Sequence, residues 1–387
     1  LSISPYAKRR IVLSGTPIPN SLKDLWTQIT FLWPENYPLG NQMVYNQYVN
    51  KKSQVGKYAE TINKLFCRIK KKDLNLPEPV WEPISVELNK HQREIYNIIA
   101  ARTLREIQEM SITDQAKIQK FRVARMIRLL QAASNPTLLY EMSPEFDVDN
   151  QSFSEQFGLH STGIKLPKIE PALYEKIINY SQYEIPSKMV AAHKLAKKLY
   201  DQGKKVIIWS SFIGNMNIFK IQLFKDIDPI IINGDVPRDT SILGNRDELI
   251  NKFKNSKEPQ ILIATAASLG ESVSLHKNLN NEKVCEHAIY LDRNFNAGQY
   301  MQSMDRIHRI GMDPNSHVQY HLIIGTNTID EAINRRLNEK WENMLNVLND
   351  DMLSTLDINP EPEEFNPSEF NLDYQALVEH LKRLAGT

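Results

Sequence analysis

Three side chains near the carboxyl end, Gln302, Arg306 and Arg309, have types and spacing suited to binding an anion. They share one face of the helix predicted over residues 297–307, unless that helix unwinds at its end. Arginine remains charged at physiological pH and binds phosphate in a bidentate manner. Two arginines on one face therefore predict a polyanion site. The alternative is an exposed face whose arginines pair with Asp305 or neighbouring residues.

Small and hydroxylated residues follow the buried strand predicted over residues 261–264. They include Thr265, Ala266, Ser268 and Gly270. Small residues let backbone N–H groups approach a phosphate closely. The alternative is a helix start at which Thr265 or Ser268 caps the first amides. Taken by itself, this segment favours the helix start.

A third segment lies near the beginning of the chain. A short buried strand is predicted over residues 10–13, and Gly15, Thr16 and Pro17 stand in the turn that follows it. Such a turn lies at the carboxyl end of a strand, which is the usual ligand edge of an open α/β sheet. Turns of this composition mostly only reverse the chain, so the segment is weak evidence when taken alone.

Strands and helices alternate over residues 187–345. These elements must position the arginines and the small residues described above. Strands are predicted at 206–209, 229–232, 261–264, 288–291 and 318–323, and helices at 188–202, 215–223, 246–255, 297–307 and 329–348. Near-continuous Ile, Val and Leu strands between amphipathic helices indicate a parallel sheet covered on both faces. The sequence therefore predicts an α/β fold.

The remaining chain divides by composition. Residues 1–90 carry the first turn, and 91–186 contain two long helices followed by a loop-rich connector with a short helix at 172–180. Residues 346–387 read as an acidic, proline-rich linker and a helix at 373–384. The helical segment or the tail offers surfaces for protein partners.

Composition excludes several classes of protein. The net charge is +1, and only two cysteines occur, Cys67 and Cys285, which gives neither a disulfide framework nor a cysteine-rich metal site. We therefore expect an intracellular protein of the cytoplasm or nucleus. No apolar run approaches the ~20 residues that span a bilayer, so no membrane association is expected. The chain begins with Leu1, and we expect it to be part of a longer protein.

In order and wording, these segments resemble the motifs of Snf2-family, superfamily 2 DNA-dependent ATPases, from motif III onward. The matching ranges are 10–34 (motif III), 66–76, 86–96, 129–139, 206–212 (motif IV), 232–235, 261–275 (motif V), 299–311 (motif VI) and 325–333. Motif V departs from the family pattern because it keeps one glycine and has Ser274 in place of asparagine. Met312 stands where glutamine often follows motif VI.

The resemblance implies two RecA-like lobes that sandwich ATP, with double-stranded DNA lying across both. This chain would hold the end of the first lobe (1–90), a helical insertion (91–186) and the second lobe (187–345). It implies that Arg306 and Arg309 act in catalysis, with Arg309 as the arginine finger and Gln302 placing them. The other implied sites are Gly270 and Glu271 at the nucleotide, Thr265, Ala266, Ser211, Phe212 and Gly234 at DNA, and Gly15, Thr16 and Pro17 coupling the two.

The sequence lacks the Gly-x-x-x-x-Gly-Lys-[Ser/Thr] motif and the Asp-Glu pair that precede motif III in the family. We therefore expect ATP and Mg²⁺ to be held mainly by a first-lobe part outside this chain, and the chain to be inactive alone. Its own residues offer no metal site. In the full-length protein the resemblance implies ATP-dependent translocation on duplex DNA.

Two alternatives remain open at this point. One is a non-catalytic DNA-binding scaffold of the same fold, which the altered motif V favours and the intact Arg306 and Arg309 oppose. The other is a sugar-nucleotide transferase, which shares the α/β pattern. A transferase would not need the Gly15–Thr16–Pro17 turn and the Gln302, Arg306 and Arg309 set in this order.

Overall fold

The computed structural model describes residues 3–13, 24–48, 76–109, 115–139, 171–269, 273–313, 315–349 and 369–386. Contacts divide the chain into two compact units. One consists of Leu1–Leu74 with Arg336–Asp373, and the other of Asn75–Arg335 with Tyr374–Thr387. The larger, second unit contains most of the residues that the sequence assigns to the site.

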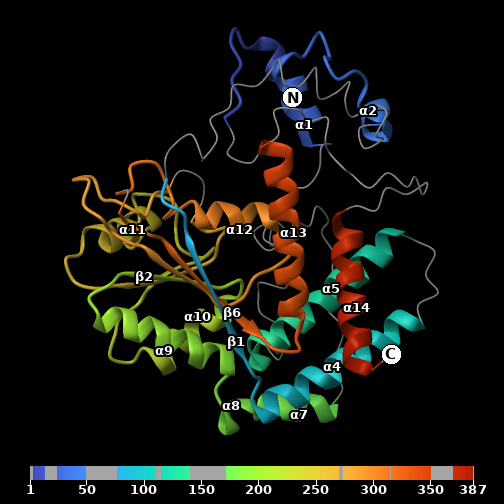
Figure 1. Ribbon diagram of the computed structural model, residues 1–387, viewed down its shortest axis with the longest axis vertical. Helices are drawn as coiled ribbons and strands as arrows, with labels where there is room; N and C mark the ends of the chain where they lie inside the picture. The colour runs from blue at the N-terminus through green and yellow to red at the C-terminus, as the bar shows by residue number, and fades with distance from the viewer. Residues whose placement is uncertain are drawn as a thin grey trace. The chain divides into compact units, whose positions relative to one another are not determined.

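A six-stranded parallel sheet forms the centre of the larger unit (Figure 1). Its strands are β1 (Val80–Val86), β2 (Val206–Trp209), β3 (Ile230–Ile232), β4 (Ile261–Ala264), β5 (His287–Tyr290) and β6 (Gln319–Gly325). They lie in the order β1-β6-β5-β2-β4-β3, and every neighbouring pair is parallel. The predicted α/β class, with a RecA-like parallel sheet between helices, is confirmed.

Helices cover both faces of this sheet. Helix α9 (Ser187–Asp201) and helix α10 (Ile213–Ile218), which continues as the π-helical turn η5 (Phe219–Leu223), pack on one face against side chains such as Val206 and Ile208. Helix α12 (Ala297–Met304) covers the other face, where the hydroxyls of Tyr290 and Tyr320 bond to Ser303 and Met304. Figure 1 shows α9 and α12 on opposite sides. Burial on both faces explains the unbroken apolar strands.

Strand β1 belongs to this sheet although it lies within the expected segment 1–90. It pairs with β6 along its whole length, from Val80 opposite Gln319 to Val86 opposite Gly325. It forms an edge, where Pro83 is tolerated because one side of an edge strand donates no ladder hydrogen bond. The expected boundaries of the four segments stay predictions.

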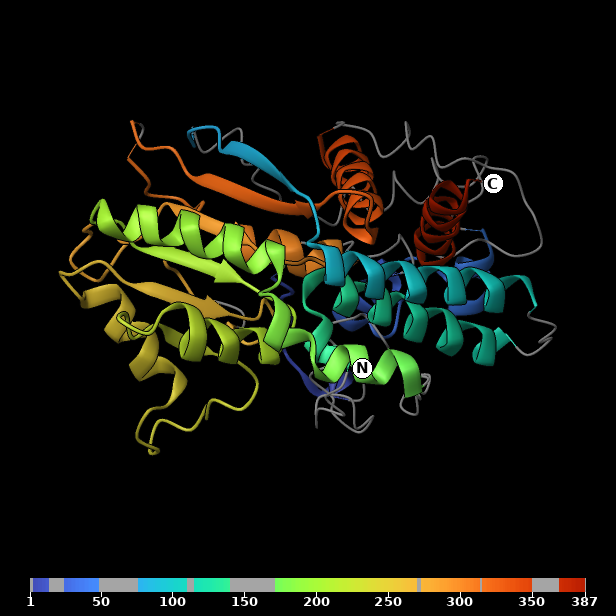
Figure 2. The ribbon, with the colours of Figure 1, turned by 90° about the horizontal axis from the view of Figure 1, so that it is seen from below.

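The two long helices predicted between residues 91 and 140 are confirmed as α4 (Lys90–Gln108) and α5 (Gln115–Ser134). They pack side by side (Figure 2), with Ile95 and Ile127 buried. Around them lie the turn η3 (Pro136–Leu139), α7 (Pro171–Ile178) and α8 (Tyr180–Tyr183). Helix α11 (Arg246–Asn255) contacts β3 on the sheet.

Two further helices follow the sheet in the sequence, α13 (Ile329–Asn349) and α14 (Glu369–Ala385). The first residue of α13 donates its N–H to the buried hydroxyl of Tyr96 on α4 at 2.7 Å. The same hydroxyl bonds to Nε2 of His380 on α14 at 2.9 Å. One tyrosine of the helical insertion therefore joins the start of α13 to the terminal helix.

The smaller unit holds the turn η1 (Ser4–Tyr6), α1 (Asp24–Leu32) and α2 (Gln42–Tyr48). The strand predicted at residues 10–13 is wrong: these residues have no regular structure, and Ile11 and Leu13 are 75% and 91% exposed. A strand needs a partner for its backbone groups, and the described residues of this unit contain none. None of the described helices is long and apolar enough to cross a membrane.

Candidate active site at the carboxyl edge of the sheet

Three residues predicted to contact DNA follow neighbouring strands at one edge of the sheet. Ser211 comes two residues after β2, Thr265 directly after β4, and Gly234 two residues after β3. Because β2, β4 and β3 are adjacent and parallel, their carboxyl ends lie side by side. The fold thus brings together segments from three separate parts of the sequence.

The residues predicted to contact DNA differ in their exposure to solvent. Gly234 is exposed, and Ser211 and Ala266 are partly exposed. Phe212 is 1% exposed, so any contact that it makes would come from its backbone. Thr265 is also buried, and its Oγ1 accepts from the N–H of Ser268 at 3.1 Å, although residues 266–269 form turns and not the helix start of the alternative.

The motif VI helix is shorter than predicted. Helix α12 begins at Ala297, where Asn296 caps it by accepting from the Gln299 N–H at 3.1 Å, and it ends at Met304. The Tyr320 hydroxyl donates to the Met304 carbonyl at 2.9 Å and so occupies an acceptor at the helix end. Gln302 therefore lies on α12, while Arg306 and Arg309 lie in the turn beyond it.

The turn nevertheless brings the two arginines together. Nη1 of Arg306 and Nη1 of Arg309 donate to the same carbonyl oxygen, that of Val273, at 3.2 and 3.1 Å. Arg306 is 6% exposed, and Arg309 is half-buried. A carbonyl oxygen has two lone pairs, so both are used by the pair. Two guanidinium groups held this close raise the local positive potential and favour an anion beside them.

A second set of contacts ties motif V to motif VI. The Leu275 N–H donates to the Arg306 carbonyl at 2.8 Å. Nε2 of His276 bonds to the Ile310 carbonyl at 3.1 Å, and Nδ1 bonds to the Ser274 hydroxyl at 2.7 Å. Nε2 must carry the proton to donate to a carbonyl, so Nδ1 accepts from Ser274. Burial lowers the pKa of His276, which favours this neutral form.

Sequence reasoning missed His276 and noted Ser274 only as a departure from the family. The two residues act as one connection because the serine fixes the histidine tautomer. Gly311 follows the connected segment with φ of +91°, a conformation that L side chains rarely adopt. The nearest signal in the sequence was the Ile-Gly pair that closes motif VI.

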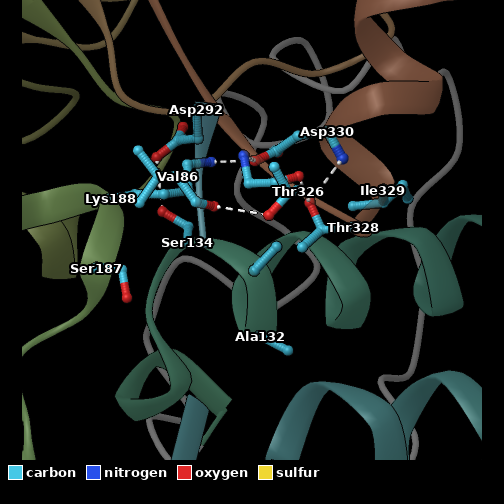
Figure 3. Close-up of polar contacts among 12 residues, drawn as sticks. Val86, Ala132, Ser134, Ser187, Lys188, Asp292, Thr326, Thr328, Ile329 and Asp330 are labelled. Carbon is cyan, nitrogen blue, oxygen red and sulfur yellow. Dashed lines mark hydrogen bonds and ion pairs between the residues drawn. The ribbon is translucent and has the colours of Figure 1, made fainter. Parts of the chain in front are cut away.

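A buried ion pair closes the carboxyl end of β6. Nζ of Lys188 on α9 lies 2.6 Å from Oδ2 of Asp330 on α13, and both side chains are buried (Figure 3). The same oxygen accepts from the Gly325 N–H at 2.9 Å. Thr328 donates to the Gly325 carbonyl at 2.8 Å and completes the turn. These contacts fix the turn between β6 and α13.

Several predicted site residues lie outside the described residues. They are Gly15, Thr16 and Pro17 of the expected coupling turn and Gly270 and Glu271 of the expected nucleotide site. Val273, which anchors both arginines, follows Glu271 by two positions. Among the described residues, no group of three or more His, Cys, Asp or Glu side chains is arranged to hold a metal ion. The described part thus offers donors for phosphate, while a place for Mg²⁺ is not found in it.

Two protein families match this chain, in the same order along the sequence as the motifs. Residues 4–138 match the family described as SNF2-related domain, and residues 187–311 match the helicase conserved C-terminal domain. A solved structure of the Sulfolobus solfataricus SWI2/SNF2 ATPase core in complex with dsDNA is 20% identical. The match covers 90% of this chain and 63% of that chain, with a TM-score of 0.46.

Curated relatives match nearly the whole chain. An uncharacterized ATP-dependent helicase of Mycoplasma genitalium is 26% identical over 348 residues, 88% of this chain. The human SWI/SNF-related matrix-associated actin-dependent regulator of chromatin subfamily A member 1 is 25% identical over 339 residues, 84% of this chain. The chain spans 28% of the length of each of these relatives. With both domain matches in the order of its motifs, the chain belongs to the Snf2 family of helicase-like proteins.

Proposed function

We propose that the full-length protein is a DNA-dependent ATP hydrolase that couples hydrolysis to movement along double-stranded DNA. The observation that supports this most directly is the shared attachment of Arg306 and Arg309 to the Val273 carbonyl. Guanidinium groups of this kind stabilise charge on a transferring phosphoryl group. The relatives described as ATP-dependent helicases support the use of ATP.

Within this pair, Arg309 is the proposed arginine finger. It is half-buried, whereas Arg306 is 6% exposed, so Arg309 has more freedom to turn toward a ligand. Its Nη1 rests on a neutral carbonyl, and its remaining N–H groups suit the oxygens of a γ-phosphoryl group. Gln302 lies on α12, four positions before Arg306, and would help to place the two arginines.

The nucleotide lies against residues that this chain supplies only in part. Gly270 and Glu271 would line its phosphate side, since they directly precede the segment that carries Val273. ATP supplies the phosphoryl group, and Mg²⁺ would be held mainly by the first lobe outside this chain. The chain by itself is therefore proposed to be inactive. Gly15, Thr16 and Pro17 would couple the cleft to DNA.

Duplex DNA is proposed to lie along the carboxyl ends of β2, β4 and β3. Ser211, Ala266 and Gly234 present exposed or partly exposed surface there. Small side chains let the phosphate backbone approach closely, and Phe212 and Thr265 would support this edge mainly from beneath. Contacts to phosphate carry no sequence information, so this edge would bind DNA with little sequence preference.

A non-catalytic scaffold of the same fold is the second candidate. It is favoured by motif V, where Ser274 bonds to His276 and so has a local structural role in place of the family asparagine. The intact Arg306 and Arg309 pair opposes it, because a scaffold has no use for two arginines gathered on one oxygen. The helical insertion or the tail would provide surfaces for protein partners in either case. We place either form inside the cell.

The deciding experiment is steady-state ATP hydrolysis by the full-length protein with no DNA, with single-stranded DNA and with duplex DNA. The proposal expects turnover that duplex DNA stimulates by at least tenfold, about 1.4 kcal/mol in activation free energy. Duplex binding without any turnover would replace the motor with the scaffold. Stimulation by single strands alone would contradict translocation on duplex DNA.

A further inference from the structure

A buried carboxyl group lies two residues after β5, beside the edge proposed for DNA. Asp292 is 4% exposed, and four donors reach its side chain. The hydroxyls of Ser134 and Ser210 donate at 3.0 and 2.9 Å, and Nδ2 of Asn215 lies at 3.1 Å. The fourth donor is the backbone N–H of Ser211. Figure 3 shows Asp292 and Ser134 facing one another.

Asn215 extends this group of side chains. Its Nδ2 also lies 2.9 Å from the Ser134 hydroxyl and 3.2 Å from that of Ser210. Its Oδ1 accepts from Nδ2 of Asn135 at 3.1 Å. We call these six residues the Asp292 cluster: Ser134, Asn135, Ser210, Ser211, Asn215 and Asp292.

The cluster joins three segments that are distant in sequence. Ser134 and Asn135 come from the end of α5, Ser210, Ser211 and Asn215 from the segment after β2, and Asp292 from the end of β5. Ser134, Asn135 and Asn215 are fully buried. The end of the helical insertion is thereby hydrogen-bonded to Asn215 of α10 and to Asp292, which in turn binds Ser210 and Ser211.

Packing alone does not account for this arrangement. Burying a carboxyl group costs free energy unless partners compensate it, and apolar side chains of similar volume are often as stable. Among the described residues, none forms an ion pair with Asp292. One of its oxygens, Oδ1, instead accepts from the Ser211 N–H. The carboxyl group therefore sets the backbone orientation of Ser211.

We propose that Asp292 is a positioning residue for DNA binding, which holds the turn of Ser210–Phe212 in the form that receives a phosphate. Ser134 and Asn135 complete this support, so the end of α5 belongs to the DNA-binding edge without touching DNA. The inference rests on the proposed function, because it assigns a task within the same DNA site. It also makes the helical insertion a place from which DNA affinity is adjusted.

The test uses Asp292→Asn in the full-length protein. This change keeps the side-chain size but leaves one acceptor oxygen where the carboxylate has two, so the Ser211 N–H and the donors at Oδ2 can no longer all be satisfied. We expect the duplex DNA concentration for half-maximal ATPase stimulation to rise about tenfold, as for one lost hydrogen bond to a charged group. The kcat at saturating DNA stays within about twofold of wild type, because uniform binding is what is lost.

Two serine variants provide matched measurements. Ser134→Ala removes one donor to Asp292, and we expect about a threefold rise in the half-saturating DNA concentration. Ser187→Ala is the control, because Ser187 is a buried serine near the same sheet edge whose Oγ accepts from the Asn89 N–H at 2.8 Å. It has no hydrogen bond to Asp292, so its half-saturating concentration stays at the wild-type value while its Tm falls.

The outcomes separate the possibilities. A half-saturating DNA concentration unchanged in Asp292→Asn, with a lowered Tm, overturns the inference and leaves Asp292 a structural residue. An equal rise in Ser187→Ala overturns it as well, because general loosening would then explain the effect. If Asp292→Asn does not fold, Ser134→Ala decides. If the wild-type protein neither binds duplex DNA nor is stimulated by it, the proposed function itself fails, and the inference fails with it.

Discussion

Two buried or half-buried cations of the larger unit, Lys188 and Arg309, have opposite surroundings. Lys188 is 0% exposed, and its ammonium lies 2.6 Å from the carboxylate of Asp330. Arg309 is half-buried, and its Nη1 rests 3.1 Å from the neutral carbonyl of Val273. Among the described residues, none forms an ion pair with Arg309.

Under the proposed function, the difference is the one expected between a structural charge and a functional one. A fully buried ammonium is tolerated only with an opposite charge, which Asp330 supplies to Lys188, while the Gly325 N–H helps to hold that carboxylate in place. A guanidinium that rests on a neutral carbonyl, with no carboxylate of the described residues paired to it, keeps most of its attraction for an anion. The first cation therefore serves the fold, and the second is the one that the proposed function assigns to a phosphate.

Breaking the Lys188 pair gives the largest expected loss of stability. Asp330→Asn leaves a buried ammonium without its counter-charge, so we expect the free energy of unfolding to fall by about 3–5 kcal/mol. Urea unfolding monitored by the tryptophans of the larger unit measures this. The double change Lys188→Met with Asp330→Leu removes both charges and should cost less than Asp330→Asn alone. A double variant as unstable as the single one would contradict the importance of charge.

The second prediction concerns pH at His380. Burial, followed by nearby Arg383, lowers the pKa of His380 to about 4 from its ordinary 6.5. Between these values the unfolded chain binds more protons than the folded one. The stability that neutral His380 contributes is therefore fully present above about pH 6.5 and is lost as pH falls toward 4, by about 3 kcal/mol.

Unfolding of wild type and His380→Gln at pH 7 and pH 4.5 measures this contribution. The variant should lose less stability on acidification than wild type does. His287 stays in both proteins, and its pKa is also lowered to about 4, mainly by burial, so the variant keeps part of the pH dependence. Equal losses in the two proteins would show that His380 stays neutral for another reason or charges without penalty.

A third prediction concerns the turn between β6 and α13, which carries Asp330, the partner of Lys188. A Cβ added at Gly325 would lie 2.9 Å from Oγ1 of Thr328 and 3.2 Å from Oδ2 of Asp330. Both neighbours would have to move, so Gly325→Ala should lower the unfolding free energy by about 1–3 kcal/mol. Gly203→Ala gives the cost of backbone strain alone for comparison, because its φ is +78° and nothing lies within 4 Å of the added Cβ. A Gly325→Ala protein as stable as wild type would contradict the importance of the close contact.

The parts of the fold that the sequence predicted are those with local signals. Strands β2 and β4 have the predicted bounds, because four consecutive apolar residues in each are buried on both faces. Helix α11 also has the predicted bounds, and Asn245 caps it at its start. The strand prediction for residues 10–13 failed because an apolar run indicates only that a strand is favourable. A strand also needs a neighbouring strand to pair with.

The parts that the sequence did not predict depend on distant contacts. At the end of the motif VI helix, the Tyr320 hydroxyl bonds to the Met304 carbonyl, and the Leu275 N–H bonds to the Arg306 carbonyl just beyond it. Lys188 and Asp330 stand 142 positions apart, and no local pattern announces their pairing. For the site, the sequence predicted that Arg306 and Arg309 lie together, while their common acceptor, the Val273 carbonyl, became evident only in the structure. Their role stays a proposal.

The smallest expected change in stability belongs to Arg309. Arg309→Ala removes a hydrogen bond to one half-buried carbonyl that Arg306 still reaches, so the unfolding free energy should stay within about 0.5 kcal/mol of wild type. Arg309 would then differ from Lys188 in contributing little to the free energy of unfolding. A loss as large as that of Asp330→Asn would remove the distinction between the two cations.

The most direct test of the central claim is the kcat of ATP hydrolysis by full-length Arg309→Ala at saturating ATP and duplex DNA, measured beside its ATP affinity. The account predicts a loss of at least about 10³-fold in kcat with ATP still bound, as for removal of an arginine finger. Arg309→Lys should recover little, because an ammonium cannot donate to two phosphoryl oxygens in the same fork. A kcat close to wild type in Arg309→Ala would contradict the assignment and leave Arg309 a structural residue like Lys188.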